Sequence, residues 1–170
     1  MKIVKNKVQV ACMAAALMAI LNLILFSSPA LAQTTPSTKE TTMSAHGPFD
    51  VKLVPQDDKL NDGISRMVLD KQYHGDLEGS SKGQMLATGS AKSSGVYVAV
   101  ETFTGTLQGK AGGFALYHTG IMAKGAPNLN INVVPDSGTG QLAGISGKMT
   151  ITVAPDGKHT YDFEYTLPTN

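Results

Sequence analysis

Cysteine, arginine and tryptophan are nearly absent from this chain of 170 residues. Cys12 is its single cysteine, Arg66 is its single arginine, and it has no tryptophan. The chain beyond Cys12 therefore has no disulfide, no thiol nucleophile and no thiolate metal ligand. A domain without these must be stabilised by its hydrophobic core alone, and about 120 residues are enough to build one.

Basic residues are also few for a protein that binds polyanions. Lysine and arginine together number 14 against 13 acidic residues, and they form no run beyond the first seven residues. Because nucleic acids are bound largely by neutralising their phosphates, we predict no nucleic acid partner. Anionic lipid surfaces attract basic clusters for the same reason, so binding to such a surface is not predicted either.

Residues 1–32 have the order of a secretory signal peptide. Three lysines precede an apolar run over residues 8–26, and an A-x-A site ends at Ala32. We predict cleavage between Ala32 and Gln33, export to the periplasm or the exterior, and no stable membrane association afterwards. Cleavage removes three lysines and no acid, which changes the formal charge from +1 to −2. An uncleaved membrane anchor is the alternative, and Asn22 within the apolar run argues against it.

Residues 33–46 are rich in threonine and serine and lack apolar periodicity, which predicts a disordered linker. The domain is predicted over residues 47–170, where apolar residues alternate in short segments separated by glycine, proline and aspartate. Eight strands are expected, over residues 49–53, 64–77, 84–89, 96–106, 114–121, 129–134, 148–153 and 160–167.

Eight short strands joined by tight turns predict an all-β fold. With no helical pattern after residue 32, the arrangement favours an eight-stranded antiparallel up-and-down barrel. Closure of the barrel would also remove exposed strand edges. A two-sheet sandwich fits the same pattern and is the alternative.

The motif Gly-x-Leu-x-Gly occurs three times, at intervals of 30 and 35 residues. Repetition at this spacing predicts three similar hairpin turns, which an up-and-down barrel places at one end. The repeated leucines are expected to plug that end. The glycines expected in the turns are Gly75, Gly79, Gly105, Gly109, Gly140 and Gly144.

Turn chemistry predicts the register of two hairpins. Pro155 and Gly157 suit a three-residue type I turn with a bulge, which pairs Ala154 with Lys158. This register places the large apolar residues of both strands on one face of the sheet.

The Gly105 hairpin is expected to have a loop of even length centred between Gly109 and Lys110. That loop pairs Phe103 with Leu116 and sets Glu101 directly opposite His118. Opposed side chains in an antiparallel pair are close enough for a charge-assisted hydrogen bond.

Several polar and aromatic residues are expected near the barrel rim opposite the glycine turns. The functional interpretation is that Glu101 and His118 orient a ligand or exchange a proton at the mouth of an apolar cavity. The structural interpretation is that they form a hydrogen bond that only fixes the core. No metal site is predicted, because the histidines have no short ligand spacing. The candidate ligand-binding residues are Arg66, Tyr97, Glu101, Phe103, His118 and His159.

Four segments resemble the bacterial domain-of-unknown-function family 3224. They are YVAVETFTG (97–105), GGFALYHTG (112–120), VVPDSGTGQLAGISG (133–147) and HTYDFEYTLP (159–168). The resemblance covers roughly residues 47–167 and implies an eight-stranded barrel of the allene-oxide-cyclase type. It implies no activity, substrate or cofactor, and we expect no cofactor.

From the sequence we predict an exported barrel that binds a hydrophobic or amphipathic small molecule in its mouth without transforming it. One alternative is an isomerase or cyclase that acts through cavity shape with Glu101 and His118. The other is a structural protein whose barrel is packed solid and which forms a homo-oligomer. The sequence does not decide whether the protein is an enzyme, and a homo-oligomer is left open under each interpretation.

Overall fold

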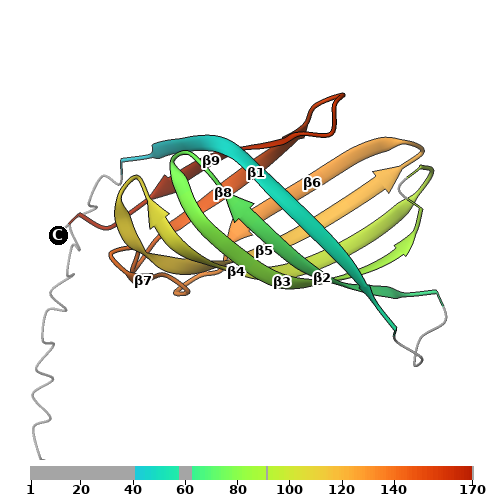
Figure 1. Cartoon of the computed structure of the whole chain (residues 1–170), viewed down its shortest axis with the longest axis horizontal. Coiled ribbons are helices and arrows are strands. Elements are labelled where there is room, and N and C mark those ends of the chain that lie inside the picture. Colours follow the sequence, from blue (N-terminus) through green and yellow to red (C-terminus); the bar gives the residue numbers. More distant parts are fainter. Residues whose placement is uncertain (1–40, 58–62, 91, 170) are drawn as a thin grey trace, which may run out of the picture. The chain divides into compact units, whose positions relative to one another are not determined.

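The computed structural model describes residues 41–57, 63–90 and 92–169, and this part of the chain is all-β with no helix (Figure 1). None of the described residues forms a helix long and apolar enough to span a membrane. The strands are β1 (Met43–Gln56), β2 (Ser65–Tyr73), β3 (Leu77–Gly89), β4 (Gly95–Leu107), β5 (Lys110–Ala123), β6 (Ala126–Val133), β7 (Thr139–Gly140), β8 (Ser146–Val153) and β9 (His159–Thr166).

The strands close into an antiparallel barrel of eight. Strands β1 to β6 pair in sequence order, β6 pairs with β8, β8 with β9, and β9 returns to β1. The two-residue strand β7 adds a short pairing to β5. The predicted fold class is therefore confirmed and the sandwich is excluded, because one continuous ladder runs around the whole barrel.

The first strand starts earlier than the sequence predicted. Met43 pairs with Tyr165 and Ala45 pairs with Phe163, so the last four residues assigned to the linker belong to β1. The prediction was wrong there because threonine and serine dominate the segment and hide an alternation that buries Ala45. Residues 33–40 of the predicted linker, and the predicted signal peptide, lie outside the described residues.

The last hairpin has the predicted register. The Ala154 amide donates to the Lys158 carbonyl at 2.8 Å, and Gly157 has a φ of 85°. Met149 pairs with Phe163, and Ile151 pairs with Tyr161. Because proline, aspartate and glycine fix both the type and the length of this turn, the register was readable from the sequence.

The Gly105 hairpin has the predicted even loop, but its centre lies one residue earlier. Leu107 pairs with Lys110 across a two-residue loop, in which Gln108 and Gly109 both have positive φ. Phe103 consequently opposes Phe114 and not Leu116. Glu101 opposes Leu116, and His118 is its diagonal neighbour on the same face.

The repeated glycines have two different roles. Gly75 and Gly109 are in turns and have φ of 93° and 80°, as the sequence predicted. Gly79 and Gly105 are instead inside β3 and β4, where they pair directly. A Cβ on Gly105 would lie 2.8 Å from the Gly79 Cα, so these two glycines allow a close approach of strands. In the third repeat Gly140 belongs to β7 and Gly144 ends the following turn.

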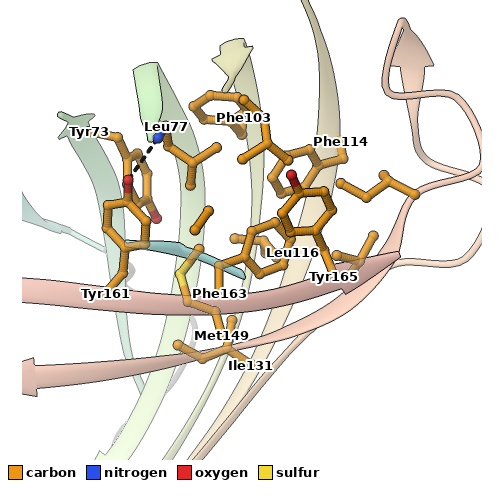
Figure 2. Packing of buried hydrophobic residues seen from close by; sticks show 14 of the residues in the cluster. Tyr73, Leu77, Phe103, Phe114, Leu116, Ile131, Met149, Tyr161, Phe163 and Tyr165 are labelled. Carbon is orange, nitrogen blue, oxygen red and sulfur yellow. Dashed lines mark hydrogen bonds between the residues drawn. The ribbon is translucent and has the colours of Figure 1, made fainter. Parts of the chain in front are cut away.

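The interior near the glycine turns is filled by leucines and aromatic rings (Figure 2). Leu77, Leu107 and Leu142 are completely buried, as expected of a plug. The hydroxyl of Tyr161 accepts from the Leu77 amide at 2.7 Å and donates to the His74 carbonyl at 3.1 Å, which ties β9 to the β2–β3 turn. The aromatic members of this cluster are Phe49, Tyr73, Phe103, Phe114, Tyr161, Phe163 and Tyr165. One end of the barrel is therefore packed solid.

Candidate functional site

The opposite end of the barrel contains an open pocket with a volume of about 450 Å³. It is enclosed by residues of β1 to β6, near the ends of these strands that are farthest from the leucine plug. Its walls are mostly apolar, and include Met67, Met85, Ala87, Tyr97, Met122 and Leu129. These residues occupy alternate positions of their strands, so they share the inner face of the sheet.

Tyr97 forms part of the pocket wall because of the glycine opposite it. Tyr97 on β4 pairs with Gly120 on β5. A Cβ placed on Gly120 would lie 2.6 Å from the Tyr97 Cδ1, so the ring lies across the bare backbone of Gly120. A larger residue at position 120 would displace the ring.

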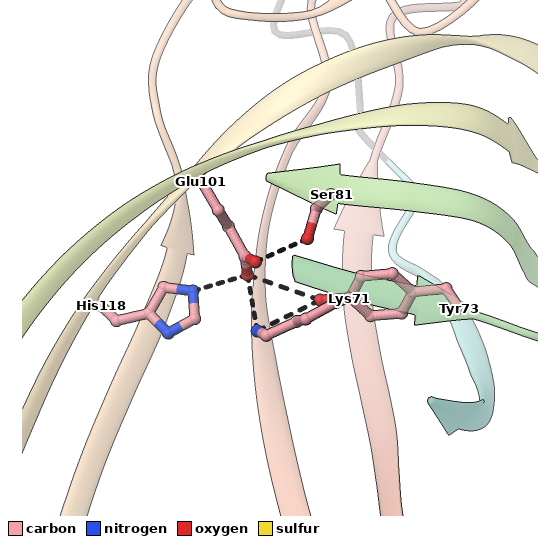
Figure 3. A network of polar contacts seen from close by, with 5 residues as sticks. All are labelled: Lys71, Tyr73, Ser81, Glu101 and His118. Carbon is pink, nitrogen blue, oxygen red and sulfur yellow. Dashed lines mark hydrogen bonds and ion pairs between the residues drawn. The ribbon is translucent and has the colours of Figure 1, made fainter. Parts of the chain in front are cut away.

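Between the pocket and the packed end lies a buried polar network centred on Glu101 (Figure 3). Its Oε1 is 2.7 Å from the Lys71 Nζ and 2.9 Å from the His118 Nε2. The Tyr73 hydroxyl donates to the same oxygen at 3.4 Å, and the Ser81 hydroxyl donates to Oε2 at 2.6 Å. Both carboxylate oxygens are therefore satisfied by donors from β2, β3 and β5.

These contacts keep Glu101 ionised. Burial alone would raise its pKa, but the hydrogen bond from His118 and the positive charge of Lys71 outweigh burial and lower the pKa to about 2. For Tyr73, burial and the Glu101 charge raise the pKa well above its ordinary value, so its hydroxyl stays protonated. The ammonium of Lys71 also lies 5.3 Å from the centre of the Phe49 ring, at a cation–π distance.

The structure brings together some of the candidate residues and separates others. Glu101 and His118 are in direct contact inside the barrel, and Tyr97 lines the pocket. Phe103 is buried in the core and does not line the pocket. His159 packs against Phe49, with ring centroids 5.2 Å apart, also outside the pocket lining.

Arg66 lies on the outer face of β2 and not at the mouth. Its neighbour Met67 lines the pocket, so alternation directs Arg66 outward, where it donates to Gln84 at 3.1 Å. The sequence assigned it to the rim from its position near a strand end without settling which face it occupies.

The sequence reasoning missed Lys71 and Ser81, which belong to the polar network around Glu101. Lys71 alternates with Leu69 and Tyr73, which are both buried, so the pattern of β2 placed a lysine on the inner face. Ser81 was harder to find, because its neighbours in β3 are polar or glycine. Among the described residues, no group of three or more histidines, cysteines or acidic residues is arranged to hold a metal ion.

A family model described as a protein of unknown function, DUF3224, matches residues 45–165. The chain belongs to the DUF3224 family. A crystal structure of a protein of unknown function from the DUF3224 family of Shewanella oneidensis MR-1 is similar, with 41% identity and a TM-score of 0.68. The match covers 77% of this chain and 100% of that protein. The comparison with curated proteins gave no match. The likeness to allene oxide cyclases stays a prediction.

Proposed function

We propose that this DUF3224 protein binds a hydrophobic or amphipathic small molecule in the mouth of its barrel. The observation that carries the proposal is the open apolar pocket of about 450 Å³. Ligand pockets in proteins commonly have volumes of about 300–1,000 Å³, are mostly apolar and include a few polar groups. The pocket has each of these properties.

The side chains of the pocket suit an apolar ligand of irregular shape. Met67, Met85 and Met122 all contribute to its walls. Methionine is flexible and polarisable, so it adapts to ligands of different shape. Tyr97 supplies a flat aromatic surface and a hydroxyl group.

Binding agrees with the structure better than either alternative does. A solid structural barrel has no open mouth, whereas here only the glycine end is packed. A cyclase or isomerase that uses Glu101 as a base needs a free carboxylate oxygen near the substrate. Both oxygens of Glu101 are already occupied by protein donors, and Glu101 does not line the pocket.

Binding of N-phenyl-1-naphthylamine, an uncharged apolar fluorophore, tests this proposal. We expect saturable binding to the wild-type protein. Ala87→Phe fills the pocket and should weaken binding by about tenfold or more. The matched control is Val98→Phe, which adds the same ring to the exposed outer face of β4 and should leave binding unchanged. No saturable binding by the wild type, or equal binding by the two variants, would contradict the proposal.

A further inference from the structure

Two polar side-chain atoms have no hydrogen-bond partner in the described part of the chain, one on a residue that lines the pocket and one on the inner-face residue of β5 next to the pocket lining. They are the Tyr97 hydroxyl and the His118 Nδ1, since His118 bonds to Glu101 through Nε2 alone. Every other polar group of the network is engaged by a neighbour. These two atoms are therefore available to a ligand.

The His118 Nδ1 is accessible although the residue is only 4% exposed. Among the described residues, no fully buried side-chain nitrogen or oxygen lacks a partner, so an unpartnered Nδ1 cannot be fully buried. Along the inner face of β5, the next residue toward the mouth is Gly120, which lines the pocket. Figure 3 shows Nδ1 on the edge of the ring that is not bonded to Glu101.

Tyr97 and His118 lie close together on the inner face. Tyr97 pairs with Gly120 and Ala99 pairs with His118, so Tyr97 and His118 are diagonal neighbours on adjacent strands. The Tyr97 ring lies across Gly120, the next inner-face residue of β5 after His118. Burial and the negative charge of Glu101 raise the pKa of Tyr97, in agreement with a protonated hydroxyl close to the network.

The chemistry of Glu101 decides what Nδ1 offers to a ligand. An ionised carboxylate only accepts hydrogen bonds, so the hydrogen that His118 shares with Glu101 is on Nε2. In the uncharged ring, Nδ1 then presents a lone pair, while the Tyr97 hydroxyl both donates and accepts. A ligand hydroxyl matches both atoms, because it donates to Nδ1 and accepts from Tyr97. A carboxylate does not match, because it would place a negative charge against a lone pair.

We propose that the ligand is an apolar molecule with a hydroxyl group, which binds His118 Nδ1 and Tyr97 while its apolar part fills the pocket. This inference rests on the proposed function and names the class of ligand. It makes His118 a binding residue that Glu101 positions.

Binding of decan-1-ol, decane and decanoate, measured by displacement of N-phenyl-1-naphthylamine at neutral pH, tests the inference. We expect decan-1-ol to bind the wild type about threefold or more tightly than decane, and decanoate to bind less tightly than decan-1-ol. Tyr97→Phe removes only the hydroxyl and should reduce the preference for the alcohol without weakening decane binding. His118→Gln keeps an N–H donor for Glu101 but replaces Nδ1 by an amide oxygen at a different position, so it should also reduce the preference, although by less than Tyr97→Phe.

The ratio of the alcohol affinity to the alkane affinity distinguishes a ligand-binding role of Tyr97 and His118 from a purely structural one. If either residue were only structural, its substitution would change both affinities together and leave the ratio unchanged. If His118→Gln does not fold, Tyr97→Phe still decides the outcome. Equal binding of decane and decan-1-ol by the wild type, or an unchanged ratio in Tyr97→Phe, would overturn the inference and leave the proposed function standing. Failure of the fluorophore and all three ligands to bind would overturn both.

Discussion

Glu101 is at the centre of the buried polar network inside the barrel. Its carboxylate is the only counter-charge in contact with the buried ammonium of Lys71 among the described residues. A buried ion pair contributes little net stability over an apolar pair, but removing one partner leaves the other charge uncompensated. The network is therefore expected to be sensitive to single substitutions.

Glu101→Gln should lower the free energy of unfolding by about 3–5 kcal/mol, because Lys71 remains buried without its carboxylate. Chemical denaturation measures this change. Asp70→Asn is the matched control, because it breaks the exposed pair with Lys82 and should cost less than about 1 kcal/mol. Equal effects of the two substitutions would mean that the network is not buried as described.

The low pKa of Glu101 also predicts how stability depends on pH. The carboxylate has a pKa of about 2 in the folded protein and an ordinary value of 4.5. The unfolded chain therefore binds more protons between these values, so stability falls as the pH is lowered from about 5 to about 2. This one group should account for a loss of about 3 kcal/mol.

Denaturation at a series of pH values checks this dependence. The wild type should lose stability over this interval more steeply than Glu101→Gln, which has no carboxyl to titrate. Parallel curves for the two proteins would show that the folded-state pKa of Glu101 is not lowered.

The sequence predicted correctly that Glu101 and His118 lie on the same face of the sheet. A hairpin loop with an even number of residues places these two residues on one face wherever the centre of the loop lies. The sequence did not predict Lys71, because a lysine is expected outside unless a partner for it is known. That partner comes from β4, two strands away in the barrel order. Such a contact depends on the curvature of the closed sheet, which the alternation pattern does not contain.

The two glycines of a Gly-x-Leu-x-Gly motif have different roles, one in a turn and the other in a close contact between two strands. In the second copy, Gly109 is in the turn, and a Cβ added to it would have no atom within 4 Å. Gly105 is in β4, directly against Gly79 of β3. The two glycines of one motif should therefore differ in their tolerance of a side chain.

Gly105→Ala should destabilise the protein more than Gly109→Ala. At Gly109 the cost is that of a positive φ for alanine, about 1 kcal/mol. At Gly105 a Cβ would also meet the backbone of β3 and force the strands apart, which should add about 1–3 kcal/mol. Thermal or chemical denaturation of both variants measures the difference, and a larger loss for Gly109→Ala would mean that the motif acts mainly through its turn.

The two hairpin registers show what sequence can decide about such elements. Pro155, Asp156 and Gly157 each restrict the turn, and the predicted pairing is confirmed. The Gly105 hairpin contains Gln108 at a φ of 47°, a conformation in which glycine or asparagine is more usual. Gln108 bonds to residues distant in sequence, donating to the Ser44 carbonyl at 2.9 Å and accepting from the Tyr165 hydroxyl at 2.8 Å. The local sequence does not contain these contacts, so it was equally consistent with a centre one residue later.

For the protein as a whole, its location stays a prediction. The A-x-A site after a lysine-led apolar run predicts that exported protein begins at Gln33. N-terminal sequencing of material recovered outside the cytoplasm checks it. Protein that retains residues 1–32 and sediments with membranes would instead support the uncleaved anchor.

The barrel is packed at one end and open at the other, and we propose above all that the open end binds an apolar small molecule. Native mass spectrometry of the protein purified from the cells that produce it is the decisive experiment. We predict that the wild type and Val98→Phe carry a small-molecule adduct, and that Ala87→Phe, whose added ring fills the pocket, does not. An unliganded mass for the wild type, or the same adduct on all three proteins, would contradict binding in the barrel mouth.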